Sequence, residues 1–188
     1  MPRKSDAHER MVRSAATLLR EHGAGATSID RVLAHSGAPR GSVYHHFPGG
    51  RTQLIEEAVA LAGDFVAGLI EAAARTGDPS VAIDKFVSLW RKWLADSDFT
   101  AGCPIVAVTV ANDDSVRLAG GVFGRWTDGL AAAFGAHGLP DARARRLAMF
   151  VIAAVEGAVI MCRAERSIEP LDAATEEIHE LLVHALRT

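Results

Sequence analysis

The side chains best suited to contact another molecule lie together at residues 40–47, in the order Arg-Gly-Ser-Val-Tyr-His-His-Phe. Val43 and Phe47 are four residues apart, so a helix over this segment would direct both toward a core. The outward face would then carry a guanidinium, a hydroxyl, a phenol and imidazoles. Such groups hydrogen-bond to base edges and phosphates, and the segment therefore predicts a surface that reads the major groove of DNA.

Two short helices and a tight turn would hold this surface. Residues 28–35 carry apolar side chains at helical spacing, and Thr27 stands before them as the predicted N-cap. A turn at Gly37 follows, and Pro39 presets the backbone for a second helix over residues 40–47. Helices joined by so short a turn must cross steeply, so the pattern predicts a helix-turn-helix.

Residues 39–47 resemble the recognition-helix signature of TetR/AcrR-family transcriptional regulators. That signature has nine positions: a turn residue, a basic residue, Gly, Ser/Thr, an aliphatic residue, Tyr, His/Tyr, His and Phe. The match covers the first quarter to third of the chain, and the Gly-Cys-Pro loop at residues 102–104 also resembles the LmrA/YxaF-like branch. One departure is visible, because Gly49 and Gly50 make the link to Arg51 one residue longer than usual and arginine replaces lysine.

The helix geometry and the resemblance together assign the DNA-contacting residues. Base contacts are expected from Arg40, Gly41, Ser42, Tyr44 and His45. Phosphate contacts are expected from Thr27, Ser28, His46 and Arg51. Two alternatives stay open: Arg40 could bind phosphate rather than a base, and Thr27 could serve only as a helix cap. No metal site is expected at His45 and His46, because adjacent helical residues diverge by about 100° and no third ligand lies near in sequence.

Helical periodicity runs through the whole chain and predicts an all-α protein of about nine helices. No segment alternates with the period of two that is expected of a strand. The expected helices span residues 5 or 6 to 23, 28–35, 40–47, 52–75, 80–95, 113 or 114 to 136, 141–164 and 171–186, and an apolar segment lies at residues 105–111.

The charge is distributed unevenly, although the formal net charge is only −3. Residues 1–51 hold eight Arg and Lys against four Asp and Glu, whereas the remainder holds twelve against nineteen. The basic part coincides with the predicted helix-turn-helix DNA-binding domain at residues 1–51. Residues 1–4 would be a basic arm, lying along phosphates or disordered. Residues 52–188 form the second predicted domain, for ligand binding and dimerisation.

The second predicted domain contains none of the usual catalytic signatures: no Gly-x-Ser-x-Gly, phosphate loop, HExxH or paired CxxC. We therefore expect no enzyme and no cofactor, although Cys103 beside Pro104 keeps a nucleophilic role open. The resemblance instead implies a cavity for a small hydrophobic or aromatic effector. Its candidate lining residues are Trp90, Trp93, Phe123 and Trp126.

The resemblance further implies a homodimer that binds a palindromic DNA operator as a repressor and leaves it when the effector binds. Residues 147–162 are apolar almost all round, and the last helix carries an apolar stripe, so two helices from each subunit could close a four-helix interface. Its candidate residues are Phe150, Gly157, Ile178, Leu181, Leu182 and Ala185. The alternative is a monomer core, in which Glu156 needs a polar partner.

Two other functions stay open: an enzyme that acts on an apolar ligand in the C-terminal bundle, and a DNA-binding activator without an effector. The chain has two cysteines and no secretory leader, and its most apolar run, at residues 147–162, is interrupted by Glu156 and Gly157. We therefore expect a cytoplasmic protein without a membrane span.

Overall fold

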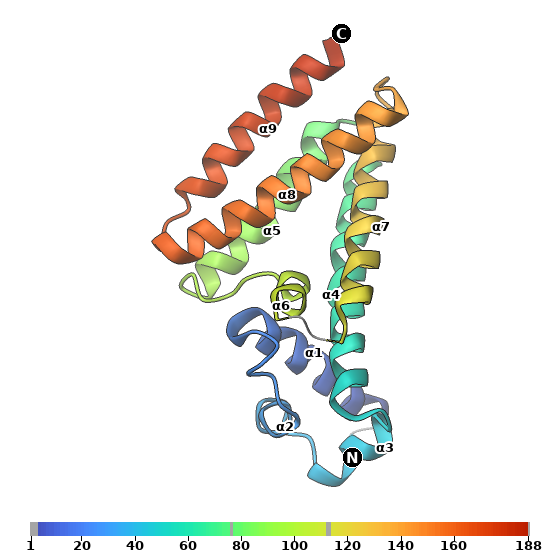
Figure 1. Ribbon diagram of the computed structural model, residues 1–188, viewed down its shortest axis with the longest axis vertical. Helices are drawn as coiled ribbons and strands as arrows, with labels where there is room; N and C mark the ends of the chain where they lie inside the picture. The colour runs from blue at the N-terminus through green and yellow to red at the C-terminus, as the bar shows by residue number, and fades with distance from the viewer. Residues whose placement is uncertain (1–3, 76, 112–113, 188) are drawn as a thin grey trace. The chain divides into compact units, whose positions relative to one another are not determined.

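The computed structural model of the chain describes residues 4–75, 77–111 and 114–187. Within these ranges the chain is helical and contains no β-strand. The elements are α1 (Lys4–His22), α2 (Ile29–Ser36), the 3₁₀ turn η1 (Arg40–Ser42), α3 (Val43–His46), α4 (Gly50–Ala74), α5 (Pro79–Asp96), α6 (Pro104–Val110), α7 (Val116–Gly135), α8 (Asp141–Glu165) and α9 (Glu169–Arg187) (Figure 1). The predicted all-α fold of about nine helices is confirmed for the described residues. Residues 1–3 of the predicted arm, and residue 113 as a predicted helix start, lie outside them.

Short-range capping explains where several helices begin and end. α2 is closed by Gly37, which lies in the left-handed region at φ 64° and donates its N–H to the Leu33 carbonyl. α5 begins at Pro79, after Asp78, whose side chain accepts from the Ser80 N–H at 2.8 Å. Because such signals are local in sequence, the predicted bounds of these helices fall close to the observed ones.

The chain forms two compact units. Unit 1 consists of Met1–Asp64 and Cys103–Val122, and unit 2 consists of Phe65–Gly102 and Phe123–Thr188. α4 and α7 therefore each supply residues to both units, and α6 packs against α1 within unit 1. This grouping adds part of α4, all of α6 and the start of α7 to the helix-turn-helix. The domain boundary expected after residue 51 stays a prediction.

The core of unit 1 holds the helix-turn-helix in place. Apolar side chains from its successive helices are buried there, namely Met11, Ala15, Leu19, Val32, Val43, Phe47, Leu54, Ile55 and Ala58. The ring of His8 on α1 stacks on Phe47, with ring centroids 4.8 Å apart. Nε2 of His8 lies 2.7 Å from Oε2 of Glu57 on α4. α1 therefore packs on the end of the recognition segment through His8, and the same side chain joins α1 to α4 by a polar contact.

Unit 2 is built from the end of α4 together with α5, most of α7, α8 and α9. α8 and α9 pack against each other, and both pack against α5. α8 is long and apolar enough to cross a membrane, but half of its most apolar window is buried inside the chain. A core helix of a soluble protein passes the same test, so this feature is weak evidence for a membrane span.

His137 connects the end of α7 to the loop before α5 within unit 2. Nδ1 of His137 lies 2.8 Å from the Ala133 carbonyl oxygen, and its Nε2 lies 2.7 Å from the Gly77 carbonyl oxygen. A neutral imidazole can donate to only one of these acceptors, whereas the imidazolium donates to both. The hydrogen bond to Ala133, and then that to Gly77, raise the pKa of His137 above its ordinary value.

Candidate nucleic-acid interface

The recognition segment begins as a 3₁₀ turn and continues as α3, so the prediction of one continuous helix over residues 40–47 is wrong. The Pro39 carbonyl accepts from the Ser42 N–H at 2.9 Å and from the Ser42 hydroxyl at 2.6 Å. These bonds close the first turn with 3₁₀ spacing. Val43 and Phe47 are 1% and 0% exposed, as their spacing predicted.

The predicted base-contacting residues lie on the outside of this segment. Arg40, Gly41, Tyr44 and His45 are exposed, and Ser42 is partly buried. Tyr44 reaches 72% exposure. A Cβ on Gly41 would meet no atom of the chain within 4 Å, and its φ is not positive. Neither packing nor backbone conformation requires this glycine, and it leaves room for an approaching surface.

Ser28, rather than Thr27, caps α2. The Ser28 side chain accepts from the Arg31 N–H at 3.3 Å. Thr27 is 1% exposed, and its hydroxyl donates to the Gly23 carbonyl at 2.8 Å. The predicted capping role of Thr27 is therefore wrong, and its buried hydroxyl is engaged by the chain itself, while its phosphate contact stays a prediction. Ser28 is exposed at the start of α2, where a helix N-terminus favours an anion.

Arg51 braces the helix-turn-helix from within unit 1. Its Nε donates to the Thr27 carbonyl at 3.0 Å, and its Nη2 donates to the Ala24 carbonyl at 2.6 Å. Both carbonyls belong to the turn between α1 and α2, whereas Arg51 lies in the first turn of α4. The sequence predicted a phosphate-binding cation here. That phosphate contact stays a prediction, while the two hydrogen bonds to the chain itself make Arg51 a positioning residue.

His46 is partly buried beside α1, in contrast to its exposed neighbour His45. The ring centroid of His46 lies 5.7 Å from that of His8, in an edge-to-face arrangement. His46 therefore packs against α1, and its phosphate contact stays a prediction. Over the ranges that the structure describes, no group of three His, Cys, Asp or Glu side chains is placed to hold a metal ion.

The four residues predicted to line an effector cavity lie together in unit 2. Ring contacts with centroid separations of 5.1–6.3 Å join them to two further aromatic residues, in the order Phe65, Trp93, Trp90, Phe86, Trp126 and Phe123. We call this set the aromatic row. Trp90 and Trp126 are each 1% exposed, whereas Phe65 is 52% exposed. The row therefore extends from an exposed ring on α4 to the buried interior of unit 2.

The predicted dimer residues are divided between the core and the surface. Ile178 and Leu182 are 0% exposed, because α9 packs against α5 and α8 of its own chain. They are therefore core residues of one subunit, which corrects their assignment to the interface. Phe150 and Gly157 are exposed, as an interface requires, while the remaining two predicted residues are partly buried, namely Leu181 and Ala185.

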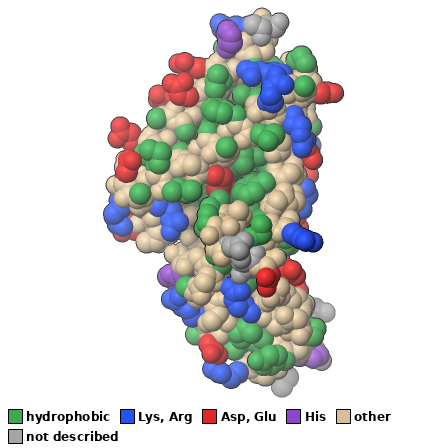
Figure 2. All heavy atoms as spheres, viewed as in Figure 1, with side chains coloured by type: hydrophobic (Ala, Val, Ile, Leu, Met, Phe, Trp, Pro, Cys, Tyr) green, Lys and Arg blue, Asp and Glu red, His purple; other side chains and the backbone are tan. Residues whose placement is uncertain are grey.

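Sequence reasoning missed most of the apolar surface that α8 exposes. Between residues 149 and 161 the exposed positions of α8 form one helical face, made of Met149, Phe150, Ala153, Gly157, Ile160 and Met161. We call this face the α8 stripe. Figure 2 shows hydrophobic side chains at the surface where α8 runs in Figure 1. The helix is apolar almost all round, so its spacing alone does not tell the exposed face from the buried one.

Two family models match the chain in succession. Residues 12–58 match the bacterial regulatory proteins of the tetR family, and residues 79–177 match the C-terminal domain of LmrA/YxaF-like transcriptional regulators. The chain is 45% identical over 187 residues to the HTH-type transcriptional regulator Rv0196 of Mycobacterium tuberculosis (strain ATCC 25618 / H37Rv), with 95% of each sequence covered. The chain belongs to the TetR family of bacterial transcriptional regulators.

More distant proteins agree with this assignment. The TetR-family chain is 26% identical over 185 residues to the HTH-type transcriptional regulator LmrA of Bacillus subtilis (strain 168), with 94% of the chain and 97% of that protein covered. Its fold is similar to that of the regulatory protein TetR from Rhodobacter sphaeroides, with a TM-score of 0.82 at 23% identity over 92% of this chain and 96% of that one. The resemblance to the family and to its LmrA/YxaF-like branch is confirmed, and with it the function of a DNA-binding transcriptional regulator.

Removing the Arg51 brace should weaken the fold of this TetR-family regulator. Arg51→Ala leaves the Ala24 and Thr27 carbonyls without these donors, and a hydrogen bond to a charged group contributes about 1.5–3 kcal/mol. We expect the free energy of unfolding to fall on the order of 1–3 kcal/mol, as measured by denaturant titration and circular dichroism. Arg13→Ala is the control, since Arg13 is 69% exposed and pairs with Glu9 one turn away. Equal stability of the Arg51→Ala and wild-type proteins would exclude the brace.

Proposed function

We propose that this regulator reads a palindromic operator with the exposed side chains of its recognition segment, binds as a homodimer in the cytoplasm, and is released by a small hydrophobic or aromatic effector. The contrast within the recognition segment carries the proposal. Val43 and Phe47 are buried, while Tyr44 is 72% and the Arg40 side chain 81% exposed. Buried anchors fix the backbone, so the exposed donors can face a groove in one orientation.

An enzymatic role receives no support from the two thiols. Cys103 is 6% and Cys162 is 0% exposed. Burial is the main cause that raises the pKa of the Cys162 thiol above its ordinary value. Since the thiolate is the nucleophile, a buried and protonated thiol reacts poorly. We therefore propose a regulator rather than an enzyme.

Replacing Arg40 with alanine should relax base discrimination. A guanidinium that bonds guanine O6 and N7 together contributes about 1–3 kcal/mol of discrimination, so the loss should appear at one base pair in each half-site. The probe is the duplex that the wild-type protein selects from a random-sequence library, titrated together with all its single base-pair variants. Arg13→Ala removes an equal charge from α1 and should preserve the pattern. A uniform loss of affinity in Arg40→Ala would assign Arg40 to phosphate.

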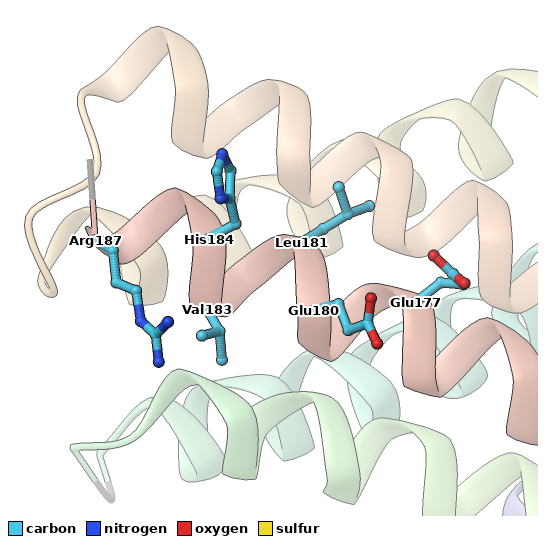
Figure 3. Close-up of a pocket in the computed structure, with 6 residues that line it drawn as sticks. All are labelled: Glu177, Glu180, Leu181, Val183, His184 and Arg187. Carbon is cyan, nitrogen blue, oxygen red and sulfur yellow. The ribbon is translucent and has the colours of Figure 1, made fainter.

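The proposed dimer interface combines the α8 stripe with the outer face of α9. A surface pocket on α9 is lined by Glu177, Glu180, Leu181, Val183, His184 and Arg187. Figure 3 shows the two carboxylates toward one end of this set and Arg187 at the other. A two-fold axis that sets α9 antiparallel to its copy would bring the acidic end of each helix to the basic end of the other. Apolar exposure and self-complementary charge both support a homodimer.

Ile160→Asp should separate the subunits without unfolding them. The Ile160 side chain is 52% exposed in one subunit, so an aspartate there stays solvated in the monomer. In the dimer the same charge would be buried without a partner, which is strongly unfavourable. We expect a monomer by light scattering with wild-type helicity by circular dichroism. Val110→Asp on α6, where Val110 is 76% exposed, should keep the dimer. An intact Ile160→Asp dimer would place the interface elsewhere.

Effector binding is proposed at the aromatic row. The Trp90 indole N–H is buried and has no hydrogen-bond acceptor among the described residues, and an unmet buried donor is costly. A planar ligand that carries an acceptor would satisfy this donor and stack on the neighbouring rings. Since α4 supplies residues to both units, we propose that ligand binding is transmitted along α4 to the Arg51 brace and shifts the population away from the DNA-bound state.

Planar aromatic ligands with an acceptor should change the tryptophan emission, because Trp90, Trp93 and Trp126 all belong to the aromatic row. Operator affinity should fall over the same ligand concentrations, and the operator should weaken the ligand by the same factor. Trp90→Phe keeps an aromatic ring but removes the N–H, so it should weaken ligands with an acceptor more than matched ligands without one. A screen in which every bound ligand leaves operator affinity unchanged would favour an effector-independent regulator.

A further inference from the structure

The exposed guanidinium of Arg40 lies against a carboxylate of the neighbouring helix. Nη2 of Arg40 is 3.0 Å from Oδ1 of Asp30, and the two side chains are 81% and 71% exposed. Asp30 is the second residue of α2, and Arg40 is the first residue of η1. The ion pair therefore joins the two arms of the helix-turn-helix across their turn, on the surface that carries the base-reading candidates.

Both partners of this pair stand on a defined backbone. Ser28 caps α2 two residues before Asp30, and Pro39 holds φ at −64° directly before Arg40. Between them, Gly37 adopts a left-handed φ of 64°, which glycine takes without strain. Local structure thus fixes the backbone positions from which the carboxylate and the guanidinium extend.

We propose that Asp30 is a specificity-determining residue, which orients the Arg40 guanidinium toward a base edge. This inference rests on the proposed base contact of Arg40. A guanidinium is planar and has five N–H donors, and Nη2 carries two of them, one on each edge of the fork. A carboxylate that accepts one leaves the other edge with two parallel N–H groups, which match the O6 and N7 acceptors of guanine. The restraint also reduces the side-chain freedom that Arg40 loses on binding.

The same carboxylate opposes binding to arbitrary DNA. Non-specific binding depends on cations that neutralise phosphates and release counterions. Asp30 balances the charge of Arg40, so a phosphate gains less from this pair than from an isolated arginine. A base edge carries no net charge and is read by hydrogen bonds. Asp30 therefore widens the ratio between operator and non-operator affinity, partly by repelling the wrong partner.

Asp30→Asn in the full-length protein tests this role. The probes are the duplex that the wild-type protein selects from a random-sequence library, its single base-pair variants, and a scrambled duplex, all at one salt concentration. We expect tighter binding of the scrambled duplex. We also expect about three- to tenfold less discrimination at the base pair that Arg40 reads. This loss is smaller than the loss of a complete bidentate contact, because the arginine itself remains. In the Arg40→Ala background, Asp30→Asn should reduce the discrimination no further.

Glu9→Gln is the matched control. Glu9 is 67% exposed and also pairs with an arginine, Arg13, so its loss removes the same charge from unit 1 and should leave discrimination unchanged. Full discrimination in Asp30→Asn, or an equal change at all base pairs, would overturn the proposal. If Arg40→Ala loses discrimination and Asp30→Asn does not, Asp30 has no such role and the base contact stands. If the wild-type protein selects no palindrome, the proposed function itself fails.

Discussion

Two hydrogen bonds from the Arg51 guanidinium, to the carbonyls of Ala24 and Thr27, hold together the parts on which DNA reading depends. Buried carbonyls in a turn between helices need hydrogen-bond donors. The Ala24 carbonyl also accepts from the Thr27 N–H at 3.1 Å, and Arg51 supplies a charged donor to each of the two carbonyls from the first turn of α4. The α1–α2 turn and the start of α2 are thereby fixed to α4, and the recognition segment is anchored on this frame by buried Val43 and Phe47.

Several cations of the helix-turn-helix form hydrogen bonds or ion pairs within the chain. A DNA-binding regulator that uses such directed donors needs less overall positive charge, which fits the net charge of −3. Arg31 donates to the Ala26 carbonyl, Arg51 donates to the turn, and Arg40 pairs with Asp30. Cations held in this way act less as a diffuse positive field and more as donors of fixed direction. On the proposed function, we expect this arrangement to reduce affinity for arbitrary DNA and to make the direction of each donor available for discrimination between sequences.

Helix positions and buried anchors could be predicted from the sequence because they follow local signals. Helical spacing placed Val43 and Phe47 inside, and one glycine and one proline marked the turn. The contacts that the sequence did not predict join distant residues. Arg51 donates to carbonyls 24 and 27 residues earlier in the chain, and the spacing of apolar residues contains no information about such a bond. The assignment of Ile178 and Leu182 to the dimer interface was wrong for a related reason. A stripe shows that Ile178 and Leu182 are buried, but not which molecule buries them.

A single-atom change in the DNA gives the sharpest test of whether Arg40 reads a guanine in the major groove. Replacing guanine with 7-deazaguanine keeps the base pair and the backbone and removes the N7 acceptor from that groove. In the duplex selected by the wild-type protein, we expect one guanine per half-site at which this replacement weakens binding of the wild type but not of Arg40→Ala. Equal losses in both proteins, or no sensitive guanine in either half-site, would contradict base reading by Arg40.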